Sequence, residues 1–361
     1  MSERSFWKGR RVLVTGHSGF KGGWMATWLT HLGSCVAGFA LPPNTEPAFF
    51  HLCHLADRLE SKLGDIRDFA AVEGAARSHQ PEIIFHFAAQ PLVRLSYEQP
   101  VETFATNIMG IVNVLEAAKT TPSVRAVVVV TSDKCYENRG WVWGYRENEA
   151  MGGRDPYSAS KGCAELVAAS YQHSFFRTAN ATVATVRAGN VIGGGDWSAD
   201  RLVPDAARAF ASSKPLAVRN PSSVRPWQHV LDPLYGYLML AEKIVSEQRR
   251  WEGGWNFGPS EAGAISVAAL ADMIVQSWSQ GTSWERVDQV SPPHEEAYLK
   301  LDSSKARQIL GWRPRLRVRE AVEWTVAWYK LALESGDKAD LFGFTVSQIS
   351  RYQERVAHAE E

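Results

Sequence analysis

A tyrosine and a lysine stand four residues apart at the start of an amphipathic segment in the middle of the chain. The run Asp155-Pro156-Tyr157-Ser158-Ala159-Ser160-Lys161 predicts a helix, and residues four apart lie on one helix face, so Tyr157 and Lys161 point the same way. A nearby ammonium stabilises a phenolate and lowers the tyrosine pKa from its usual value of about 10. The pair therefore predicts Tyr157 as a general base near neutral pH. The alternative is a chance spacing on a solvated helix face.

Three further polar residues, Ser132, Asp133 and Lys134, follow a valine-rich run at 127–130 that predicts a buried strand. Ser132 supplies a hydroxyl that can hydrogen-bond to an alcohol substrate beside the tyrosine. Asp133 and Lys134 add two titratable groups at the carboxyl end of that strand, where open α/β sheets bind ligands. Oxidising an alcohol needs little beyond the hydroxyl, whereas eliminating water needs an acid and a base, so the pair predicts elimination. The alternative for Asp133 and Lys134 is an exposed ion pair in a loop.

A glycine-rich loop, residues 15–22 with the sequence TGHSGFKG, directly follows the first apolar run. Its glycines permit a tight turn from strand to helix and let the backbone approach a pyrophosphate closely. The N-terminus of the following helix favours phosphate groups. Residues expected to contact a dinucleotide here are Gly16, His17, Gly19, Phe20, Lys21 and Gly22.

The residues around this loop leave the choice between NAD and NADP open. The second predicted strand, 35–40, does not end in Asp or Glu for the adenosine ribose, nor in Arg for a 2′-phosphate. His17 and Lys21 are alternative contacts for phosphate or ribose. Asp65 and Ile66 follow the third predicted strand, where a carboxylate can meet the adenine amino group. For Asp65 a surface turn is an equally good interpretation.

Short apolar runs alternate with amphipathic segments through the first half of the chain, which predicts a parallel α/β sheet. Strands are expected at 11–15, 35–40, 59–63, 82–87, 127–130 and 181–186, and helices at 22–32, 68–79, 101–119 and 157–176. We predict a Rossmann-type doubly wound sheet in 1–188 that binds a nicotinamide dinucleotide, and a smaller mixed α/β lobe in 189–333 that binds the substrate. Segments near 226–257 are candidates to return to the first unit, and 334–361 is predicted to be a helical tail.

Composition narrows the class of protein further. The 361 residues carry 39 basic and 39 acidic side chains, so no basic excess points to nucleic acid. No apolar run is long enough for a membrane span, and the N-terminus has no leader pattern. The four cysteines form no C-x-x-C pair, so we expect neither a metal site nor a disulfide framework, and a cytoplasmic location.

Together these motifs resemble the extended short-chain dehydrogenases/reductases over about residues 10–330. Further matches are the Ala-Ala-Gln run after the fourth strand, an asparagine in the next helix, and the late runs 301–305 and 310–314. The resemblance implies NAD as the cofactor and a homodimer, or a homotetramer, paired through the helices 101–119 and 157–176. It also implies support of the cofactor site by Ala88, Ala89, Gln90 and Asn107.

Within this family the chain resembles the sugar-nucleotide 4,6-dehydratases that act on CDP-glucose. The resemblance lies in Asp133-Lys134, where relatives acting on dTDP-glucose have Asp-Glu, and in the runs 90–100, 141–148 and 187–197. It implies that Tyr157 takes the C4 hydroxyl proton, that Lys134, if neutral, takes the C5 proton, and that Asp133 protonates the leaving C6 oxygen. If Lys134 stays charged, it acts as an electrostatic stabiliser and another group is the base.

The implied product is CDP-4-keto-6-deoxyglucose, for deoxysugar (O-antigen) biosynthesis, and the implied preference for cytosine rests on the resemblance alone. The alternatives are a sugar-nucleotide epimerase, a dehydratase for another nucleotide, and a non-catalytic dinucleotide-sensing protein. Arginine suits bidentate contact with a diphosphate, and the helix that begins after Arg201 can present N–H groups to one. Expected substrate contacts are Asn190, Arg201, Leu202, Arg225, Asn256, His294 and Tyr298.

Overall fold

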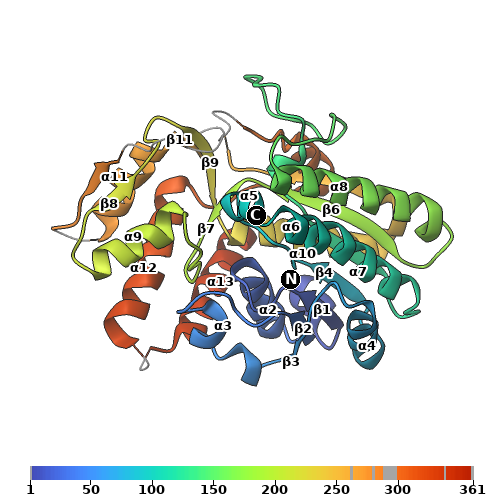
Figure 1. Ribbon diagram of the computed structural model, residues 1–361. Coiled ribbons are helices and arrows are strands. Elements are labelled where there is room, and N and C mark those ends of the chain that lie inside the picture. Colours follow the sequence, from blue (N-terminus) through green and yellow to red (C-terminus); the bar gives the residue numbers. More distant parts are fainter. Residues whose placement is uncertain (1, 261–262, 279–280, 288–298, 337–338, 359–361) are drawn as a thin grey trace.

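Seven parallel strands form the central sheet of the computed structural model, in the order β10-β6-β5-β4-β1-β2-β3 (Figure 1). The structure describes all residues except 1, 261–262, 279–280, 288–298, 337–338 and 359–361. The sheet strands are β1 (Arg11–Thr15), β2 (Cys35–Ala40), β3 (Glu60–Leu63), β4 (Ile83–His86), β5 (Ala126–Val130), β6 (Thr182–Ala188) and β10 (Gly253–Phe257). The chain order reverses between the neighbouring strands β4 and β1. A crevice therefore forms outside the carboxyl ends of these two strands, where such folds bind ligands.

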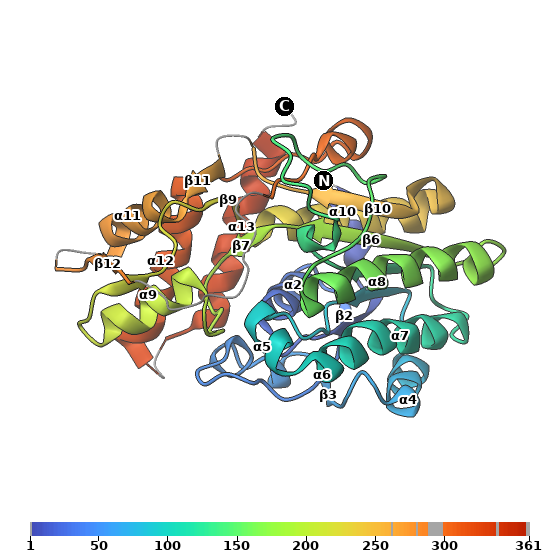
Figure 2. The same ribbon diagram turned by 45° about the horizontal axis from the view of Figure 1, so that its top comes forward.

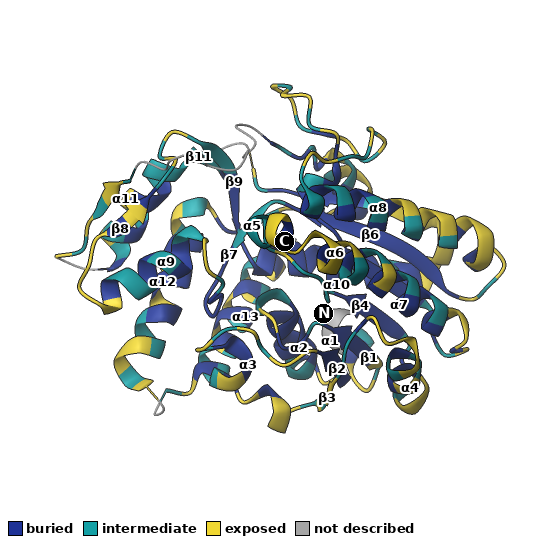
Figure 3. Cartoon of the chain, in the orientation of Figure 1, coloured by how far each residue is buried: buried dark blue, intermediate teal, exposed yellow. Residues whose placement is uncertain are grey.

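Helices cover both faces of the sheet because its strands are apolar on both sides. Alternate residues of one strand enter opposite cores: Val128 of β5 packs with Trp28 and Leu234, whereas Val127 packs with Ile111. One face is covered by α2 (Phe20–His31) and α10 (Leu231–Glu247), and the other by α4 (Phe69–His79), α7 (Gly110–Lys119) and α8 (Pro156–Tyr171). The helices α7 and α8 are mostly buried or half-buried: α7 exposes only Lys119, and α8 exposes Leu166, Ala169 and Ser170 (Figure 3). The predicted doubly wound α/β fold is confirmed.

The two long helices predicted from the sequence each contain a π-helical turn. The first runs through α6 (Pro100–Phe104), a π turn (Ala105–Met109) and α7. The second is α8, extended by a π turn at Gln172–Phe176. The Asp155 carboxylate caps α8 by accepting hydrogen bonds from the Ser158 N–H at 2.9 Å and from its hydroxyl at 2.5 Å. This cap sets the first turn of α8, which carries Tyr157.

The second lobe is built from two small sheets and three helices (Figure 2). Its mixed sheet, in the order β11-β9-β7, contains one antiparallel and one parallel pair. Its elements are β7 (Asn190–Ile192), α9 (Leu202–Ala211), β8 (Leu216–Val218), β9 (Val224–His229), β11 (Ala264–Ser266), α11 (Val267–Trp278), β12 (Trp284–Arg286) and α12 (Val318–Ser335). Between β9 and β11 the chain returns to the first unit through α10 and β10, which pairs in parallel with β6. The strand β9 itself stays in the second lobe.

The C-terminal segment is helical, as predicted, and it belongs to the main core. The helix α13 (Leu341–His358) buries Ile349 and Tyr352, and the Tyr352 ring meets Trp28 of α2 edge-on at 5.7 Å between ring centroids. Within the described residues, the remaining short helices are α1 (Ser2–Trp7), α3 (Phe49–Leu52), α5 (Val93–Glu98), three 3₁₀ turns (Leu55–Asp57, Asp133–Cys135 and Gln248–Trp251) and a π turn (Ala306–Leu310). Among the described helices, none combines the length and apolar character that a membrane span requires.

Candidate active site

The glycine loop forms a tight turn between β1 and α2 that leaves no room for a side chain at position 16 or 22. Gly16 has a φ of +77°, and a Cβ on it would lie 2.7 Å from the backbone nitrogen of Ala88. A Cβ on Gly22 would lie 2.1 Å from the carbonyl oxygen of Gly16. The loop therefore presents bare backbone at the edge where the strand order reverses, which suits a dinucleotide pyrophosphate.

His17 of this loop turns toward β2 and β3. Its Nε2 lies 2.8 Å from the Ser61 hydroxyl, and a Cβ on Gly38 would lie only 2.3 Å from its ring. Burial lowers the pKa of His17 to about 4, although a backbone hydrogen bond with Phe39 opposes the shift, so the imidazole is neutral at pH 7. The ring thus occupies the space beside β2 that only a glycine at position 38 leaves free.

Lys21, also in the loop, faces the same space as the predicted catalytic residues. Its Nζ donates a hydrogen bond to the Tyr237 hydroxyl at 3.4 Å. Burial, together with the charges of Lys161 and Arg201, lowers its pKa to about 7, while Asp133 opposes the shift. The ammonium is therefore close to half-titrated at neutral pH.

Asn107 fastens the loop after β4 to α8. Its carbonyl oxygen accepts the Gln90 backbone N–H at 2.8 Å, and its amide donates to the Gln90 carbonyl at 3.1 Å and to the Ser160 hydroxyl at 2.8 Å. Ala88 donates its backbone N–H to the Thr15 hydroxyl at 3.3 Å, and Ala89 lies between these two attachments. The Ala-Ala-Gln segment is thus held against the end of β1.

Asp65 and Ile66 lie at the carboxyl end of β3. The Asp65 carboxylate forms an ion pair with Arg67 at 2.6 Å, and hydrogen bonds with Arg67 hold the pKa of Asp65 below its usual range. Ile66 is buried and packs against Gly110, where a Cβ would lie 2.8 Å from the Ile66 side chain. Contact of Asp65 with adenine stays a prediction.

Tyr157 and Lys161 lie on one face of α8, but the prediction that Lys161 lowers the tyrosine pKa is wrong for this structure. Tyr157 is 8% exposed, and burial raises its pKa to about 12, although a hydrogen bond with Ser132 opposes the shift. Lys161 donates from Nζ to the Val130 carbonyl at 3.2 Å, and burial lowers its pKa to about 8. Loss of hydration outweighs neighbouring charge because both groups lie in the interior.

Asp133 lies in the interior of the site at the end of β5, where it is 5% exposed. The Ser132 hydroxyl donates to its Oδ1 at 3.0 Å, and its Oδ2 would lie 3.1 Å from a Cβ on Gly189. Burial raises the pKa of Asp133, and the positive charges of Lys134 and Arg225 only partly oppose this. A carboxyl group with a raised pKa is suited to hold a proton and to donate it.

Two arginines of the second lobe act electrostatically on these groups. Arg201, directly before α9, stabilises the ionised form of Tyr157, and Arg225, on β9, stabilises that of Asp133. Arg201 also forms an ion pair with Asp196 at 2.7 Å. Asn190 begins β7 next to the same lobe junction, and Leu202 packs partly into the main core. The arginines bring positive charge to the place where a diphosphate is expected.

Asn256 contradicts its predicted role as a substrate contact. Its side chain is fully buried, its Oδ1 accepts the Tyr136 hydroxyl at 2.8 Å, and its amide donates to the carbonyls of Tyr145 at 2.8 Å and Asp302 at 3.0 Å. Both amide hydrogens are therefore engaged within the protein. The predicted contacts His294 and Tyr298 lie outside the described residues.

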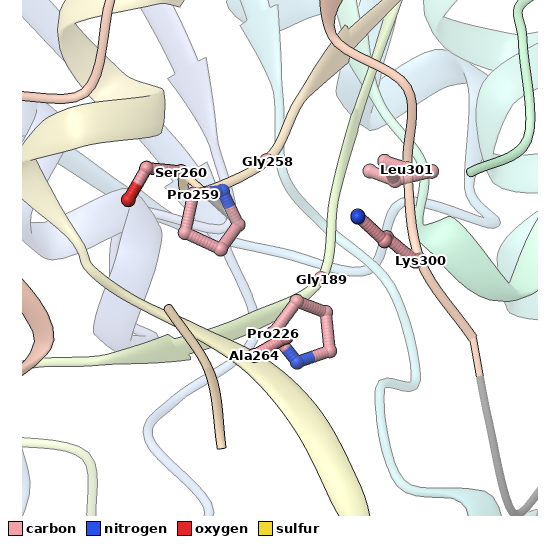
Figure 4. A pocket seen from close by; sticks show the side chains of 8 residues that line it. All are labelled: Gly189, Pro226, Gly258, Pro259, Ser260, Ala264, Lys300 and Leu301. Carbon is pink, nitrogen blue, oxygen red and sulfur yellow. The ribbon is translucent and has the colours of Figure 1, made fainter. Parts of the chain in front are cut away.

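A small cavity of about 10 Å³ lies beside Asp133 where the two lobes meet (Figure 4). Figure 4 shows Gly189 and Pro226 facing Lys300 and Leu301 across it. The sequence analysis missed Lys300, although it directly precedes the recognised run 301–305. A larger cavity of about 300 Å³ lies behind β6 and α8, and it is lined by none of the predicted site residues.

The amino-acid sequence matches a known protein family and several of its characterised members. Residues 13–325 match the family model described as GDP-mannose 4,6 dehydratase. The chain is 52% identical over 342 residues to the CDP-glucose 4,6-dehydratase of Salmonella typhimurium, covering 93% of this chain and 95% of that protein. It is 28% identical over 337 residues to a dTDP-glucose 4,6-dehydratase of Xanthomonas campestris, covering 88% and 92% of the two chains.

Solved structures share the fold. The UDP-glucose 4-epimerase of Thermotoga maritima, solved with UDP-glucose, superposes with a TM-score of 0.77 at 21% identity, covering 89% of this chain and 99% of that one. The protein MoeE5, solved with UDP-glucose and NAD, superposes with a TM-score of 0.75 at 24% identity and the same coverages.

Proposed function

This chain belongs to the GDP-mannose 4,6 dehydratase family, and from that premise we propose that it converts CDP-glucose to CDP-4-keto-6-deoxyglucose and water with the help of bound NAD. The observation that carries the dehydratase assignment is the buried carboxyl group of Asp133, which accepts a hydrogen bond from the Ser132 hydroxyl and lies beside Tyr157, and whose pKa burial raises. The choice of CDP-glucose is supported by the relative that is 52% identical over nearly the whole length. A role in deoxysugar (O-antigen) biosynthesis follows from such a product.

The residues present fit a dinucleotide such as NAD. Gly16 and Gly22 leave bare backbone where any Cβ would clash, and the free N-terminus of α2 follows them. Gly16, Gly19, Phe20 and Gly22 would hold the pyrophosphate, and the segment that Asn107 fastens would lie beside the nicotinamide half. When bound, NAD accepts a hydride from C4 of the sugar and returns it to C6.

In the oxidation step, Tyr157 takes the proton of the C4 hydroxyl while the Ser132 hydroxyl hydrogen-bonds to the same sugar oxygen. The phenol has to be ionised to act as this base, and the burial that raises its pKa to about 12 works against ionisation. Ser132 and Arg201 already favour the phenolate. Lys161, one turn along α8 on the same face, is the proposed source of further positive charge for the phenolate.

In the elimination step, Lys134, if neutral, removes the C5 proton, which the new C4 ketone has made acidic. If Lys134 stays charged, it acts as an electrostatic stabiliser and another group is the base. The electron pair of the C5–H bond forms the C5–C6 double bond, and the C6–O bond breaks. Asp133 donates its proton to the departing oxygen, so water leaves. After reduction at C6, a proton returns to C5, and the 4-keto-6-deoxy sugar is complete.

Further residues support the proposed substrate contacts, the oligomeric state and the cellular location. Arg201 and Arg225 would pair with the diphosphate of the substrate. Exposed apolar residues on α6, α8 and the π turns that continue these helices support a homodimer, or a homotetramer containing it, paired through these helices. These residues are Val101, Phe104, Met109, Leu166 and Phe175. All four cysteines are unpaired, which supports a reducing compartment, the cytoplasm.

The test incubates the purified protein and NAD with CDP-glucose, UDP-glucose or dTDP-glucose and follows each sugar nucleotide by mass spectrometry. We expect CDP-glucose to lose one water fastest, and Tyr157→Phe to leave all three substrates intact. If none of the three loses water, the enzyme assignment is overturned. Faster turnover of dTDP-glucose overturns only the nucleotide choice. An unchanged mass with inverted configuration at C4 would identify an epimerase.

A further inference from the structure

Both ends of the segment that carries Ser132, Asp133 and Lys134 are tied to one buried ion pair. At its start, the Thr131 hydroxyl donates to Glu165 Oε1 at 2.5 Å. At its end, the Tyr136 hydroxyl accepts from Arg187 Nη1 at 2.5 Å. Between these two attachments the chain makes a single 3₁₀ turn, Asp133–Cys135.

Glu165 and Arg187 form a bidentate pair with almost no exposure to solvent. Glu165 is 5% exposed and Arg187 is 3% exposed. Arg187 Nε donates to Oε1 at 2.8 Å, Nη2 donates to Oε2 at 2.7 Å, and the Thr185 hydroxyl donates to Oε2 at 2.6 Å. Burial works against ionisation of Glu165, but Arg187 and these hydrogen bonds outweigh it and hold the pKa of Glu165 below its usual range. The carboxylate is therefore charged and accepts four hydrogen bonds.

Stability alone is a weak reason for such a pair. Removing two charges from water costs about as much as their mutual attraction returns, so apolar residues of equal volume often serve as well. What an arginine fork on a carboxylate supplies is fixed geometry. The guanidinium of Arg187 fits in this position only because residue 254 of β10 is a glycine. A Cβ there would lie 2.3 Å from Arg187 Nη2.

Glu165 also belongs to the helix face that carries Tyr157 and Lys161. The three residues are spaced by four along α8, so they lie on successive turns of one face. The Glu165 carboxylate thereby connects the face that holds the phenol to Thr131, which opens the segment that holds Asp133. The Tyr136 end of that segment is connected to the same face through Arg187.

We propose that Glu165 and Arg187 are positioning residues that set the place of the Asp133 carboxyl group relative to the Tyr157 phenol. The inference rests on the proposed dehydration, in which one group must reach C4 and the other C6 of a single hexose. Because the pair holds the segment at both ends, loss of either attachment should displace Asp133 and Lys134 and slow elimination. Substrate binding and the Tyr157 base depend on contacts outside this segment and should be affected less. Ser132 lies in the segment, so C4 oxidation should slow too, but less than elimination, which needs both Asp133 and Lys134.

The test removes the Thr131 attachment with Thr131→Val and compares it with Thr185→Val. Each variant deletes one hydroxyl that donates to Glu165 and leaves the ion pair intact, but only Thr131 lies on the catalytic segment. For Thr131→Val we expect kcat for CDP-glucose dehydration to fall about tenfold or more with KM nearly unchanged. In a single turnover, reduced nicotinamide should accumulate because elimination lags behind oxidation. Thr185→Val should stay within about twofold of the unsubstituted kcat.

Equal effects of the two variants, or unchanged kcat for Thr131→Val, would overturn the positioning role. Amide hydrogen exchange over residues 132–136 supplies a readout that does not depend on turnover. It should accelerate in Thr131→Val and not in Thr185→Val; equal exchange in both also overturns the proposal. An unsubstituted protein that dehydrates none of the three sugar nucleotides instead overturns the proposed function, and the exchange measurement still decides whether the segment is held.

Discussion

Asp232 is a fully buried carboxyl group at the start of α10, and its protonation should control the stability of the core. Its Oδ1 accepts the Arg315 backbone N–H at 2.7 Å and the Tyr352 hydroxyl of α13 at 2.8 Å. Among the described residues, Oδ2 has no hydrogen-bond partner. Burial raises the pKa of Asp232 from 3.8 to about 7, although hydrogen bonds with Arg315, Tyr352 and the Leu316 backbone oppose the shift. The folded protein therefore keeps a proton that the unfolded chain loses in mild acid.

The size and sign of the effect follow from this shift. The difference, about 7 minus 3.8 or roughly 3 pKa units, corresponds to about 4 kcal/mol at 1.36 kcal/mol per unit. Between these two pKa values the folded state binds more protons than the unfolded state, so the free energy of unfolding falls as pH rises. The loss is absent below pH 3.8 and complete above about pH 7. Ionisation of Asp232 thus destabilises the fold on the alkaline side.

Urea unfolding of the unsubstituted protein and of Asp232→Asn between pH 4 and pH 8 measures how much the ionisation of Asp232 lowers the free energy of unfolding. Asparagine keeps an acceptor for Arg315 and Tyr352 but does not titrate. We expect the free energy of unfolding of the variant, relative to the unsubstituted protein, to rise by about 4 kcal/mol from the acidic to the alkaline end. Other titrating groups cancel in this difference. A difference that stays constant over the whole range would refute the reasoning, because Asp232 would then titrate alike in both states.

Two further substitutions test the cofactor loop and the proposed base. Gly22→Ala places a Cβ 2.1 Å from the Gly16 carbonyl, so NAD affinity, measured by quenching of tryptophan fluorescence, should fall at least about tenfold. Gly74→Ala on α4, where a Cβ meets nothing within 4 Å, is the matched control and should bind NAD normally. Lys134→Met should still reduce nicotinamide in a single turnover while elimination slows about 100-fold. Dehydration at full speed by Lys134→Met would show that another group is the base.

The local elements could be predicted from the sequence almost to the residue. Strands β1 and β2 begin and end where the apolar runs 11–15 and 35–40 do. The helix predicted at 68–79 is α4, which begins at Phe69 and is capped by Asp68, whose carboxylate accepts the Ala71 N–H at 3.2 Å. Such features depend on residues within a few positions of each other, so the order of residue types is enough to predict them.

Partners from distant parts of the chain could not be predicted in this way. Asn256 looked like a substrate contact, yet its side chain bonds to Tyr136, 120 positions away, and to the carbonyl of Tyr145. Glu165 and Arg187 were not singled out, although Glu165 lies four residues after Lys161 and shares its helix face. That spacing was the available signal, but only the packing of α8 on β5 and β6 shows which groups the carboxylate meets.

The sequence by itself determined the parallel α/β order, the glycine turn that lacks room for side chains at positions 16 and 22, and the common helix face of Tyr157 and Lys161. The tertiary structure alone decided the protonation states and the charge pairing of the site. The predicted drop in the Tyr157 pKa was wrong because burial depends on atoms from several segments, and here it outweighs the hydrogen bond with Ser132 and the charge of Arg201. Hydration and hydrogen-bond partners are set by the whole fold, so no spacing along the chain reveals them.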